Sequence, residues 1–266
     1  MPQVSAKLAA KTAEVSVSAR ILSILAAFEG SARPLTIAQI STKTQIPLSS
    51  TYRMVGDLEN WGALARNQDG SYQVGVRIWE LGQMAGLSQR EHLVRPFLQD
   101  LFDLVHENVH MAIRQGANAL YVDKIYGSRK LPVVSRVGSK LPLHATAVGR
   151  VLLAAEPDWF IRAYLDKKLV APTAKTTLER ESLVTELRKV TNQGYAVTVE
   201  QMRIGASSLA VPIVVGGETI ASVGIVLESA RSPELLPLLP YLKGTVERIQ
   251  VALSPNQKRV PRPNLR

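Results

Sequence analysis

Apolar positions near the start of the chain recur at the spacing of an α-helix and predict two short helices. The first covers residues 18–28, where isoleucine and leucine return every three to four positions. The second covers residues 36–42, because Thr36 followed three residues later by Gln39 forms the pattern of a capping box. A sharp break then separates this helix from the next one.

A third helix is predicted over residues 47–61, since a proline suits the first helical turn, where its missing N–H would be unpaired anyway. At about 100° per residue, the positions of this helix divide into two faces. The face that we assign to the core holds Thr51, Met54, Val55, Leu58 and Trp61. The opposite face holds Ser49, Arg53, Gly56 and Asn60, with Tyr52 at the flank.

The pattern of a β-hairpin follows, with strands at 64–66 and 71–74 on either side of the turn residues 67–70. Helix, turn, helix and hairpin in this order predict a winged helix-turn-helix, whose second helix fits the major groove of B-DNA. An isolated helix with this polar face would more often be a solvated surface, but the complete order favours DNA binding. We expect DNA contacts from Arg20, Lys43, Ser49, Ser50, Tyr52, Arg53, Arg66 and Gln68.

The rest of the chain predicts helices and a sheet. The expected helices are a linker helix near 76–88 and further helices near 90–105, 146–154, 158–165, 178–191 and 233–253. We expect the helix near 178–191 to be capped by the pattern of Thr176 and Glu179. Alternating and β-rich stretches predict strands near 109–113, 119–125, 131–137, 195–199, 209–215 and 219–226. This mixture favours an α+β fold.

Charge and composition narrow the classes of protein. The net charge of +10 favours a polyanionic partner, although residues 1–75 hold seven Lys/Arg against five Asp/Glu, a net of only +2. The absence of cysteine excludes disulfides, thiolate catalysis and cysteine zinc sites, and suits a reducing cytoplasm. No apolar run reaches the roughly 18 residues of a membrane helix, and residues 1–11 lack the apolar stretch of a secretory signal.

One motif argues for an enzyme instead. Residues 106–110 read His-Glu-Asn-Val-His, the pattern of zinc peptidases, which need both histidines on one face of a helix. The predicted helix ends near His106, however, and an alternating strand begins at Val109. In a strand, the two histidines would lie about 13 Å apart, too far to share one zinc. We therefore expect no metal and no enzymatic activity; a zinc hydrolase is the alternative, and a DNA-binding protein without a ligand is another.

Three segments carry a resemblance to a known family. A wing-to-linker pattern close to Tyr-x-Leu-Gly and Leu-Gly lies at 72–75 and 79–82. A central signature, Arg-x-Gly-x-x-Leu-Pro-x-His-Ala, lies at 136–145. A late Gly-Tyr-Ala signature lies, with changes, at 191–196. Over residues 15–253 the chain resembles the IclR family of bacterial transcription regulators. The resemblance implies a repressor or activator, without cofactor, that binds a near-palindromic operator as a homodimer or dimer of dimers and is controlled by a small organic effector.

The sequence pattern and the resemblance together predict a domain plan. A flexible arm (1–14) precedes the winged helix-turn-helix domain (15–75). The linker helix (76–88) joins that domain to a GAF-like, antiparallel-sheet effector-binding domain (89–253), and a disordered basic tail (254–266) follows. We expect the protein to act in the cytoplasm and to have no membrane partner.

The resemblance places an effector pocket at the sheet, beside the helix that starts after His144, which we expect to be a structural histidine. The expected pocket residues are Met111, Tyr121, Leu141, Ala147, Val148, Glu200, Ser208, Gly224 and Val226. Small residues at this helix start would let a ligand approach or let the helix pack closely on the sheet; the sequence leaves both open. Ser208 stands where the family often has cysteine, and Gly224 and Val226 replace hydroxyl positions. Fewer polar groups favour an aromatic or other organic acid of a catabolic pathway.

Overall fold

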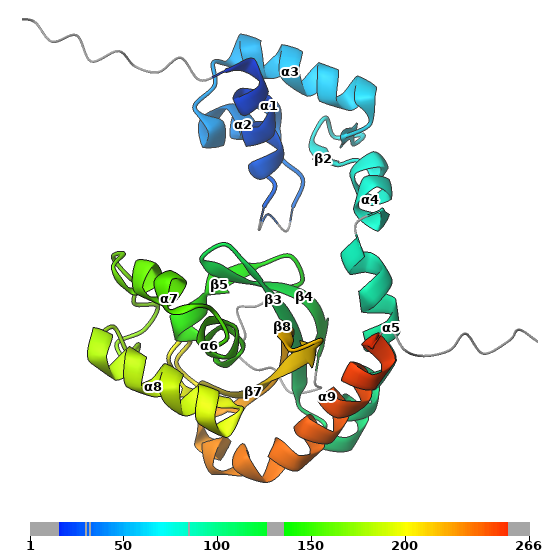
Figure 1. Cartoon of the computed structure of the whole chain (residues 1–266). Helices are drawn as coiled ribbons and strands as arrows, with labels where there is room; N and C mark the ends of the chain where they lie inside the picture. Colours follow the sequence, from blue (N-terminus) through cyan, green and yellow to red (C-terminus); the bar gives the residue numbers. More distant parts are fainter. Residues whose placement is uncertain (1–15, 30, 32, 85, 127–135, 255–266) are drawn as a thin grey trace, which may run out of the picture. The chain divides into compact units, whose positions relative to one another are not determined.

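The computed structural model describes residues 16–29, 31, 33–84, 86–126 and 136–254, and for residues 86–91 it describes the backbone alone. The predicted arm, most of the predicted strand at 131–137 and nearly all of the tail lie outside these residues. The chain divides into two compact units, residues 1–85 and 86–266 (Figure 1). No helix among the described residues is long and apolar enough to cross a membrane.

The N-terminal unit is a winged helix-turn-helix, as the sequence predicts. Its helices are α1 (Val17–Ala26), α2 (Ile37–Thr44), α3 (Leu48–Trp61) and α4 (Val76–Gln83). The wing consists of the antiparallel strands β1 (Leu64–Arg66) and β2 (Tyr72–Val74), and a bridge from Leu35 to Tyr72 joins the wing to the segment before α2.

The sharp turn between α2 and α3 is fixed by backbone conformation and by hydroxyl groups. The capping box at the start of α2 is present: Gln39 N donates to Thr36 Oγ1 (3.3 Å), and Thr36 N donates to Gln39 Oε1 (2.9 Å). Gln45 ends α2 in the left-handed region (φ 56°). The hydroxyl of Thr51 then donates to the carbonyl of Ile46, which holds the start of α3 against the turn.

The core of this unit confirms most of the predicted division of α3. Thr51, Met54, Val55 and Leu58 are buried. Trp61, which we assigned to the same face, is 46% exposed, and that assignment is wrong. The guanidinium of Arg77 in α4 lies over its ring, 4.7 Å from the centroid, so a partner from the next helix keeps this tryptophan at the surface.

The C-terminal unit is built on one six-stranded antiparallel sheet with the order β5-β4-β3-β8-β7-β6. Its strands are β3 (Asn108–Gln115), β4 (Asn118–Ile125), β5 (Lys140–Pro142), β6 (Ala196–Val199), β7 (Ala206–Val215) and β8 (Glu218–Glu228). Its helices are α5 (Gly86–Val105), α6 (Ala147–Ala154), α7 (Asp158–Leu165), α8 (Arg180–Gln193) and α9 (Leu239–Leu253), with short 3-10 turns η1 (Leu143–Ala145), η2 (Ser229–Glu234) and η3 (Leu236–Leu238).

Helices cover both faces of this sheet (Figure 1). On one face, α5 and α9 pack through a cluster that includes Leu98, Leu101 and Ile249. On the other face, α6 lies on the sheet, with α7 and α8 beyond it. Glycines permit the close approach of α6: a Cβ on Gly149 would meet the carbonyl oxygen of Leu143 at 2.4 Å, and a Cβ on Gly224 would meet Val148 Cγ1 at 2.9 Å.

Three further predictions need correction. The cap of α8 is Glu179, whose carboxylate accepts the amides of Glu181 (2.9 Å) and Ser182 (2.5 Å); Thr176 is not the cap, because its hydroxyl donates to a distant carbonyl. Arg150 belongs to a run of basic residues between Asp123 and Glu156 for which the sequence favours a solvated face, but its side chain is buried. The single helix expected at 233–253 is preceded by η2 and η3, and only its later part is α9.

Candidate functional site

The exposed face of α3 brings the predicted recognition residues together. Ser49 and Arg53 lie one turn apart on the same side of the helix, and both are exposed. Tyr52 is 60% exposed, and Ser50 is half-buried. Since the opposite face forms the core, the polar face of a helix about 21 Å long is left for a partner. A helix of these dimensions fits the major groove.

The wing presents two more predicted residues at its turn. Arg66 and Gln68 are exposed. Asp69, in the turn of the wing, accepts the amide of Ser71 at 2.9 Å and its hydroxyl at 2.5 Å. These hydrogen bonds, the side-chain one first, lower the pKa of the Asp69 carboxyl. Its role in this structure is therefore to close the turn.

The last two predicted DNA contacts lie on the first two helices. Arg20 is half-buried in α1. Lys43 is exposed near the end of α2, and its ammonium donates to the carbonyl of Ala27 (3.1 Å). An ammonium has three N–H donors, so this hydrogen bond leaves Lys43 able to contact a phosphate.

A cavity of about 50 Å³ lies between the sheet and the N-terminal end of α6. One water needs roughly 10–15 Å³ on this measure, so the enclosed space is small. Its lining comes from all six strands, from the start of α6 and from the loop between β6 and β7. The lining residues are His110, Tyr121, Leu141, Thr146, Ala147, Val148, Thr198, Met202, Arg203, Ala206, Ser207, Ser208, Gly224 and Val226.

Most of the predicted effector residues line this cavity, but two do not. Successive residues of a strand face opposite sides of the sheet, so Met111 packs in the cluster beneath α5 and α9 while His110 faces the cavity. Glu200 does not line it either. Its carboxylate accepts the amide of Gly205 (2.7 Å) and pairs with Lys175. Placing Met111 and Glu200 at the cavity is therefore wrong.

Sequence reasoning missed half of the lining: His110, Thr146, Thr198, Met202, Arg203, Ala206 and Ser207. The strand positions had a usable signal, because Gly224 pairs with His110, and Thr198 pairs with Ser208, across the sheet. Neighbours in register share a face. Met202 and Arg203 lie in a loop, for which no periodicity gives a direction.

Burial sets the charge of the polar groups in the lining. Desolvation first, and the charge of Lys124 second, lower the pKa of His110 to about 3, so its imidazole is neutral at pH 7. Desolvation likewise raises the pKa of Tyr121, although a hydrogen bond with Thr146 opposes the shift. The hydroxyls of Thr198 and Ser208 lie 2.8 Å apart. The inner lining thus offers neutral hydrogen-bonding groups.

The zinc-peptidase motif is a corner between a helix and a strand, as the sequence predicts. His106 follows the end of α5 with φ 54°, and His110 lies within β3. Glu107 pairs with Arg231, which draws its carboxylate into an ion pair with η2. Among the described residues, no group of three or more His, Asp or Glu side chains is arranged to hold a metal.

His144 is a structural histidine. It is buried, its Nδ1 lies 2.7 Å from the hydroxyl of Tyr164, and its Nε2 lies 2.9 Å from the carbonyl oxygen of Val170. These two partners tie η1 to α7 and to the segment after it. His144 therefore holds the segment before α6 in place, next to the cavity, and does not line the cavity itself.

Comparison with known proteins assigns both units. Residues 18–68 match the IclR helix-turn-helix domain, and residues 89–250 match the bacterial transcriptional regulator IclR C-terminal domain. The Pca regulon regulatory protein of Pseudomonas putida is 34% identical over 83% of this chain and 79% of its own length. The regulator TtgV, also of Pseudomonas putida, is 32% identical over 75% of this chain and 77% of its own.

Solved structures show the same fold. The Thermotoga maritima IclR has a TM-score of 0.71 at 28% identity and covers 88% of this chain and 97% of its own. An IclR homologue from Microbacterium hydrocarbonoxydans, solved with 4-hydroxybenzoate, has a TM-score of 0.85 at 24% identity over 90% and 99% of the two chains. The curated relatives are transcriptional regulators, which does not favour the hydrolase alternative. The chain belongs to the IclR family of bacterial transcription regulators.

Proposed function

We propose that each protomer reads DNA by placing the N-terminal part of α3 in the major groove, with Ser49, Ser50, Tyr52 and Arg53 at base edges and phosphates. The observation that carries this proposal is the division of α3 into a buried apolar face and an exposed polar one. An arginine can contact guanine through two parallel hydrogen bonds, and a serine hydroxyl contacts either bases or phosphates. Arg66 and Gln68 of the wing, together with Arg20 and Lys43, contact the backbone beside the groove.

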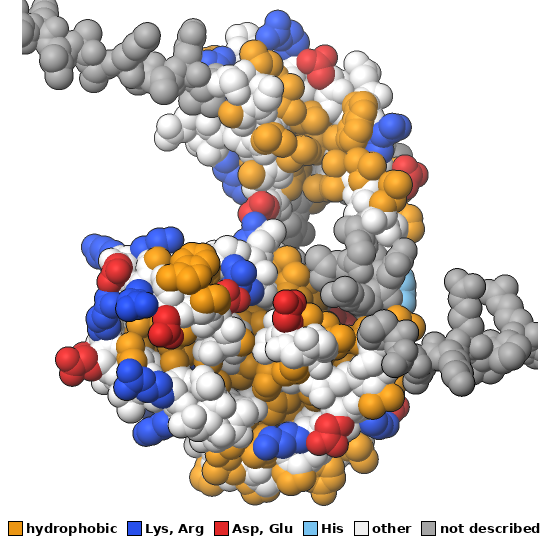
Figure 2. Space-filling view, viewed as in Figure 1, with side chains coloured by type: hydrophobic (Ala, Val, Ile, Leu, Met, Phe, Trp, Pro, Cys, Tyr) orange, Lys and Arg blue, Asp and Glu red, His pale blue; other side chains and the backbone are white. Residues whose placement is uncertain are grey.

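The operator is near-palindromic, because two copies of the chain bind it as a dimer related by a two-fold axis. Exposed apolar side chains on α4 and at its C-terminal cap support this association: Val76 is 68% exposed, Trp79 64% and the cap residue Met84 80%. Figure 2 shows hydrophobic side chains at the surface of this part of the N-terminal unit. A cluster of this kind on a short helix suits burial against another protomer. Two such dimers on one operator would form the dimer of dimers.

The cavity beside α6 binds the effector, an aromatic carboxylic acid or a related organic acid. Its apolar lining, including Leu141, Val148 and Val226, suits a ring, and the hydroxyls of Thr198 and Ser208 suit a polar substituent. The solved homologue that contains 4-hydroxybenzoate supplies a probe of this class, although its likeness to this chain concerns the fold.

Effector binding changes DNA affinity by shifting a conformational equilibrium. A ligand can do this only as far as it binds one arrangement of the protein better than the other. The helices α4 and α5, which follow each other at the junction of the two units, are the connection through which the shift would pass.

The DNA-reading face is tested with Arg53→Ala on an operator isolated by in vitro selection. We expect specific binding to weaken by about 1–3 kcal/mol, or roughly 5–150-fold in Kd, with relaxed sequence preference. The matched control is Lys189→Ala, which removes an exposed cation from α8 in the other unit. Unchanged affinity of the Arg53 variant in a fluorescence anisotropy titration would show that the reading face is assigned wrongly. Equal affinity of the parent protein for all sequences would favour a DNA-binding protein without sequence choice.

The effector site is tested by titrating the parent protein with aromatic carboxylates, 4-hydroxybenzoate first, by isothermal calorimetry. Ser208→Leu adds a branched apolar group to a cavity of about 50 Å³ and should reduce affinity about tenfold or more. Thr185→Leu, at an exposed position of α8, makes a comparable change away from the cavity and should leave affinity unaltered. Normal binding by the Ser208 variant would place the effector elsewhere.

A further inference from the structure

We propose that Arg203 selects the charge of the effector, by pairing with its carboxylate at the end of the cavity formed by the loop between β6 and β7. This inference rests on the function proposed for the cavity. Among the described residues that line the cavity, Arg203 is the one with a charged side chain, and none is Asp or Glu. The lining therefore carries a net positive charge, contributed by a side chain that sequence reasoning did not single out.

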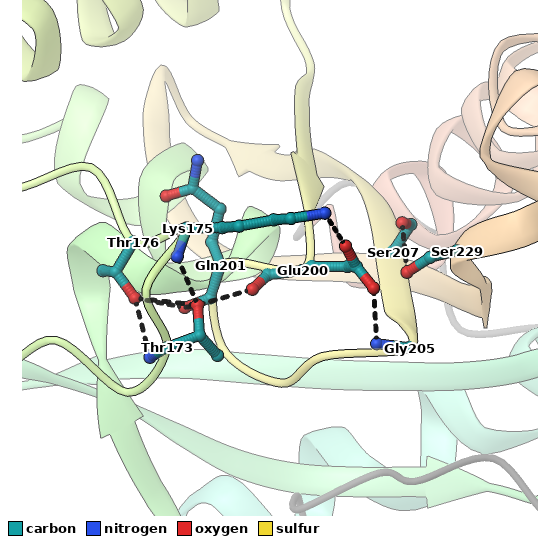
Figure 3. A network of polar contacts seen from close by, with 8 residues as sticks. All are labelled: Thr173, Lys175, Thr176, Glu200, Gln201, Gly205, Ser207 and Ser229. Carbon is teal, nitrogen blue, oxygen red and sulfur yellow. Dashed lines mark hydrogen bonds and ion pairs between the residues drawn. The ribbon is translucent and has the colours of Figure 1, made fainter.

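The loop that carries Arg203, residues 200–205, is tethered on the side where it leaves β6 (Figure 3). The hydroxyl of Thr173 donates to the carbonyl of Glu200 (2.7 Å), and the hydroxyl of Thr176 donates to the carbonyl of Gln201 (2.7 Å). The side chain of Gln201 accepts a hydrogen bond from Arg150 (2.7 Å). Through these contacts, the loop is tied to the segment before α8 and to α6.

The loop is also tethered where it enters β7. The amide of Gly205 donates to the Glu200 carboxylate (2.7 Å), and the amide of Ser229 donates to the Gly205 carbonyl (3.1 Å). The carbonyl of Arg203 itself accepts the amide of Ala206 (3.2 Å). Only a few residues between these anchors are left to span the cavity edge. The backbone at Arg203 is therefore preorganised, which lowers the ordering cost of binding a ligand there.

The nearest acid in this loop does not neutralise Arg203. Glu200 directs its carboxylate to the ammonium of Lys175 and to the amide of Gly205, as Figure 3 shows. The hydrogen bond from Lys175 is the first cause that lowers the pKa of Glu200. The Glu200 carboxylate therefore stays ionised and paired with Lys175. Within the described part of the chain, no carboxylate forms an ion pair with Arg203, whose side chain is exposed at the cavity edge.

The part of the lining on β3 and β4 favours an uncharged group, and this sets the orientation of the ligand. Tyr121 on β4 offers a hydroxyl there, beside the neutral ring of His110 on β3, and in the sheet order both strands are separated from the loop between β6 and β7 by β8. A carboxylate placed among these neutral groups would lose its hydration without gaining a counter-charge. At Arg203, it gains charge-assisted hydrogen bonds from a planar guanidinium, which matches both carboxylate oxygens.

The test compares 4-hydroxybenzoate with its uncharged analogue 4-hydroxybenzamide in isothermal calorimetry on the full-length protein. We expect the parent protein to prefer the acid by about tenfold or more, and Arg203→Gln to lose about tenfold or more in affinity for the acid. The affinity of the variant for the amide should stay within about twofold. Arg203→Lys, which keeps the charge but not the planar fork, should recover part of the preference.

Arg188→Gln is the matched control, since it removes an exposed arginine from α8, outside this cavity. It should leave both affinities unchanged. Equal losses for acid and amide in Arg203→Gln would show a structural role and overturn the proposal, as would an unchanged preference for the acid. If another aromatic carboxylate in the titration of the effector site binds better than 4-hydroxybenzoate, the test uses that acid and its amide instead. If the parent protein binds none of the carboxylates, the proposed effector class itself fails, and the charge selection with it.

Discussion

The two candidate sites of this chain are assembled in different ways. The DNA-reading surface draws most of its residues from one helix and one hairpin, between Ser49 and Gln68. The cavity draws its lining from six strands, a helix start and a loop, between His110 and Val226. The first site depends on the period of a helix, which is visible in the sequence. The second depends on strand register and on which face each strand residue takes, and these are set by pairing over long sequence separations.

The largest effect should come from truncating the core of either unit. Ile40 and Leu209 are both fully buried, one in each unit. Replacement by alanine should lower the free energy of unfolding of the affected unit by about 2–5 kcal/mol, through lost burial and the cavity left behind. Hydrogen exchange read peptide by peptide would report each unit separately. If Ile40→Ala increased exchange in β7 as much as in α2, the two units would be one cooperative body and the comparison would fail.

A smaller effect is expected where α6 approaches the sheet. In Gly149→Ala, the new Cβ would lie 2.4 Å from the backbone oxygen of Leu143. Because backbone cannot move aside cheaply, we expect a loss near the upper end of about 1–3 kcal/mol, together with weaker effector binding. Gly244→Ala, in α9, has open space at the same atom and should be neutral or slightly stabilising. Thermal unfolding and calorimetry distinguish the two variants; equal behaviour would contradict the close packing.

Mild acid should lower the stability of the C-terminal unit alone, since all four histidines of the chain lie after residue 86. Burial lowers the pKa of His110 to about 3, whereas an unfolded histidine titrates near 6.5. Below about pH 6.5, His110 is protonated in the unfolded chain but stays neutral in the folded unit. The stability that is present at pH 7 is therefore lost as the pH falls toward 3. At pH 5 the share of His110 is about 2 kcal/mol.

Urea unfolding at pH 7 and pH 5 checks this dependence. In His110→Gln, the free energy of unfolding should depend less on pH, because the contribution of His110 is removed. The contribution of His144, whose pKa is lowered chiefly by burial, should remain. A parent protein whose C-terminal unit is equally stable at both pH values would show that His110 is not held neutral.

The smallest expected effect concerns the helix-turn-helix. Thr36→Ala removes the hydroxyl that accepts the amide of Gln39 (3.3 Å) and breaks the capping box of α2. Loss of such a cap costs about 1 kcal/mol, confined to the N-terminal unit. Thr36→Ser keeps the acceptor and should lie close to the parent protein. A difference between these two variants in hydrogen exchange of α2 is the measurement; equal exchange in both would show that the cap contributes nothing.

Local signals predicted the N-terminal unit well. The capping box at Thr36, the turn before Pro47 and the division of α3 follow from short-range rules, and the structure confirms them. The exception is Trp61, because its surface position depends on Arg77 in another helix. In the C-terminal unit, every described strand except β5 was predicted, but Met111 was assigned to the wrong face. Arg203 was missed, since loop geometry depends on distant hydroxyl groups.

The tethers of the loop at residues 200–205 have a consequence for protein engineering. The loop contributes two lining side chains, Met202 and Arg203, yet its attachments are mostly hydrogen bonds to hydroxyls, to main-chain groups and to one buried arginine. A six-residue cassette that keeps Glu200, Gln201 and Gly205 can therefore be varied at its three central positions without disturbing the strand ladder. A library of this kind, read out by a fluorescent reporter under an operator of this protein, is a compact route to biosensors that respond to new acids.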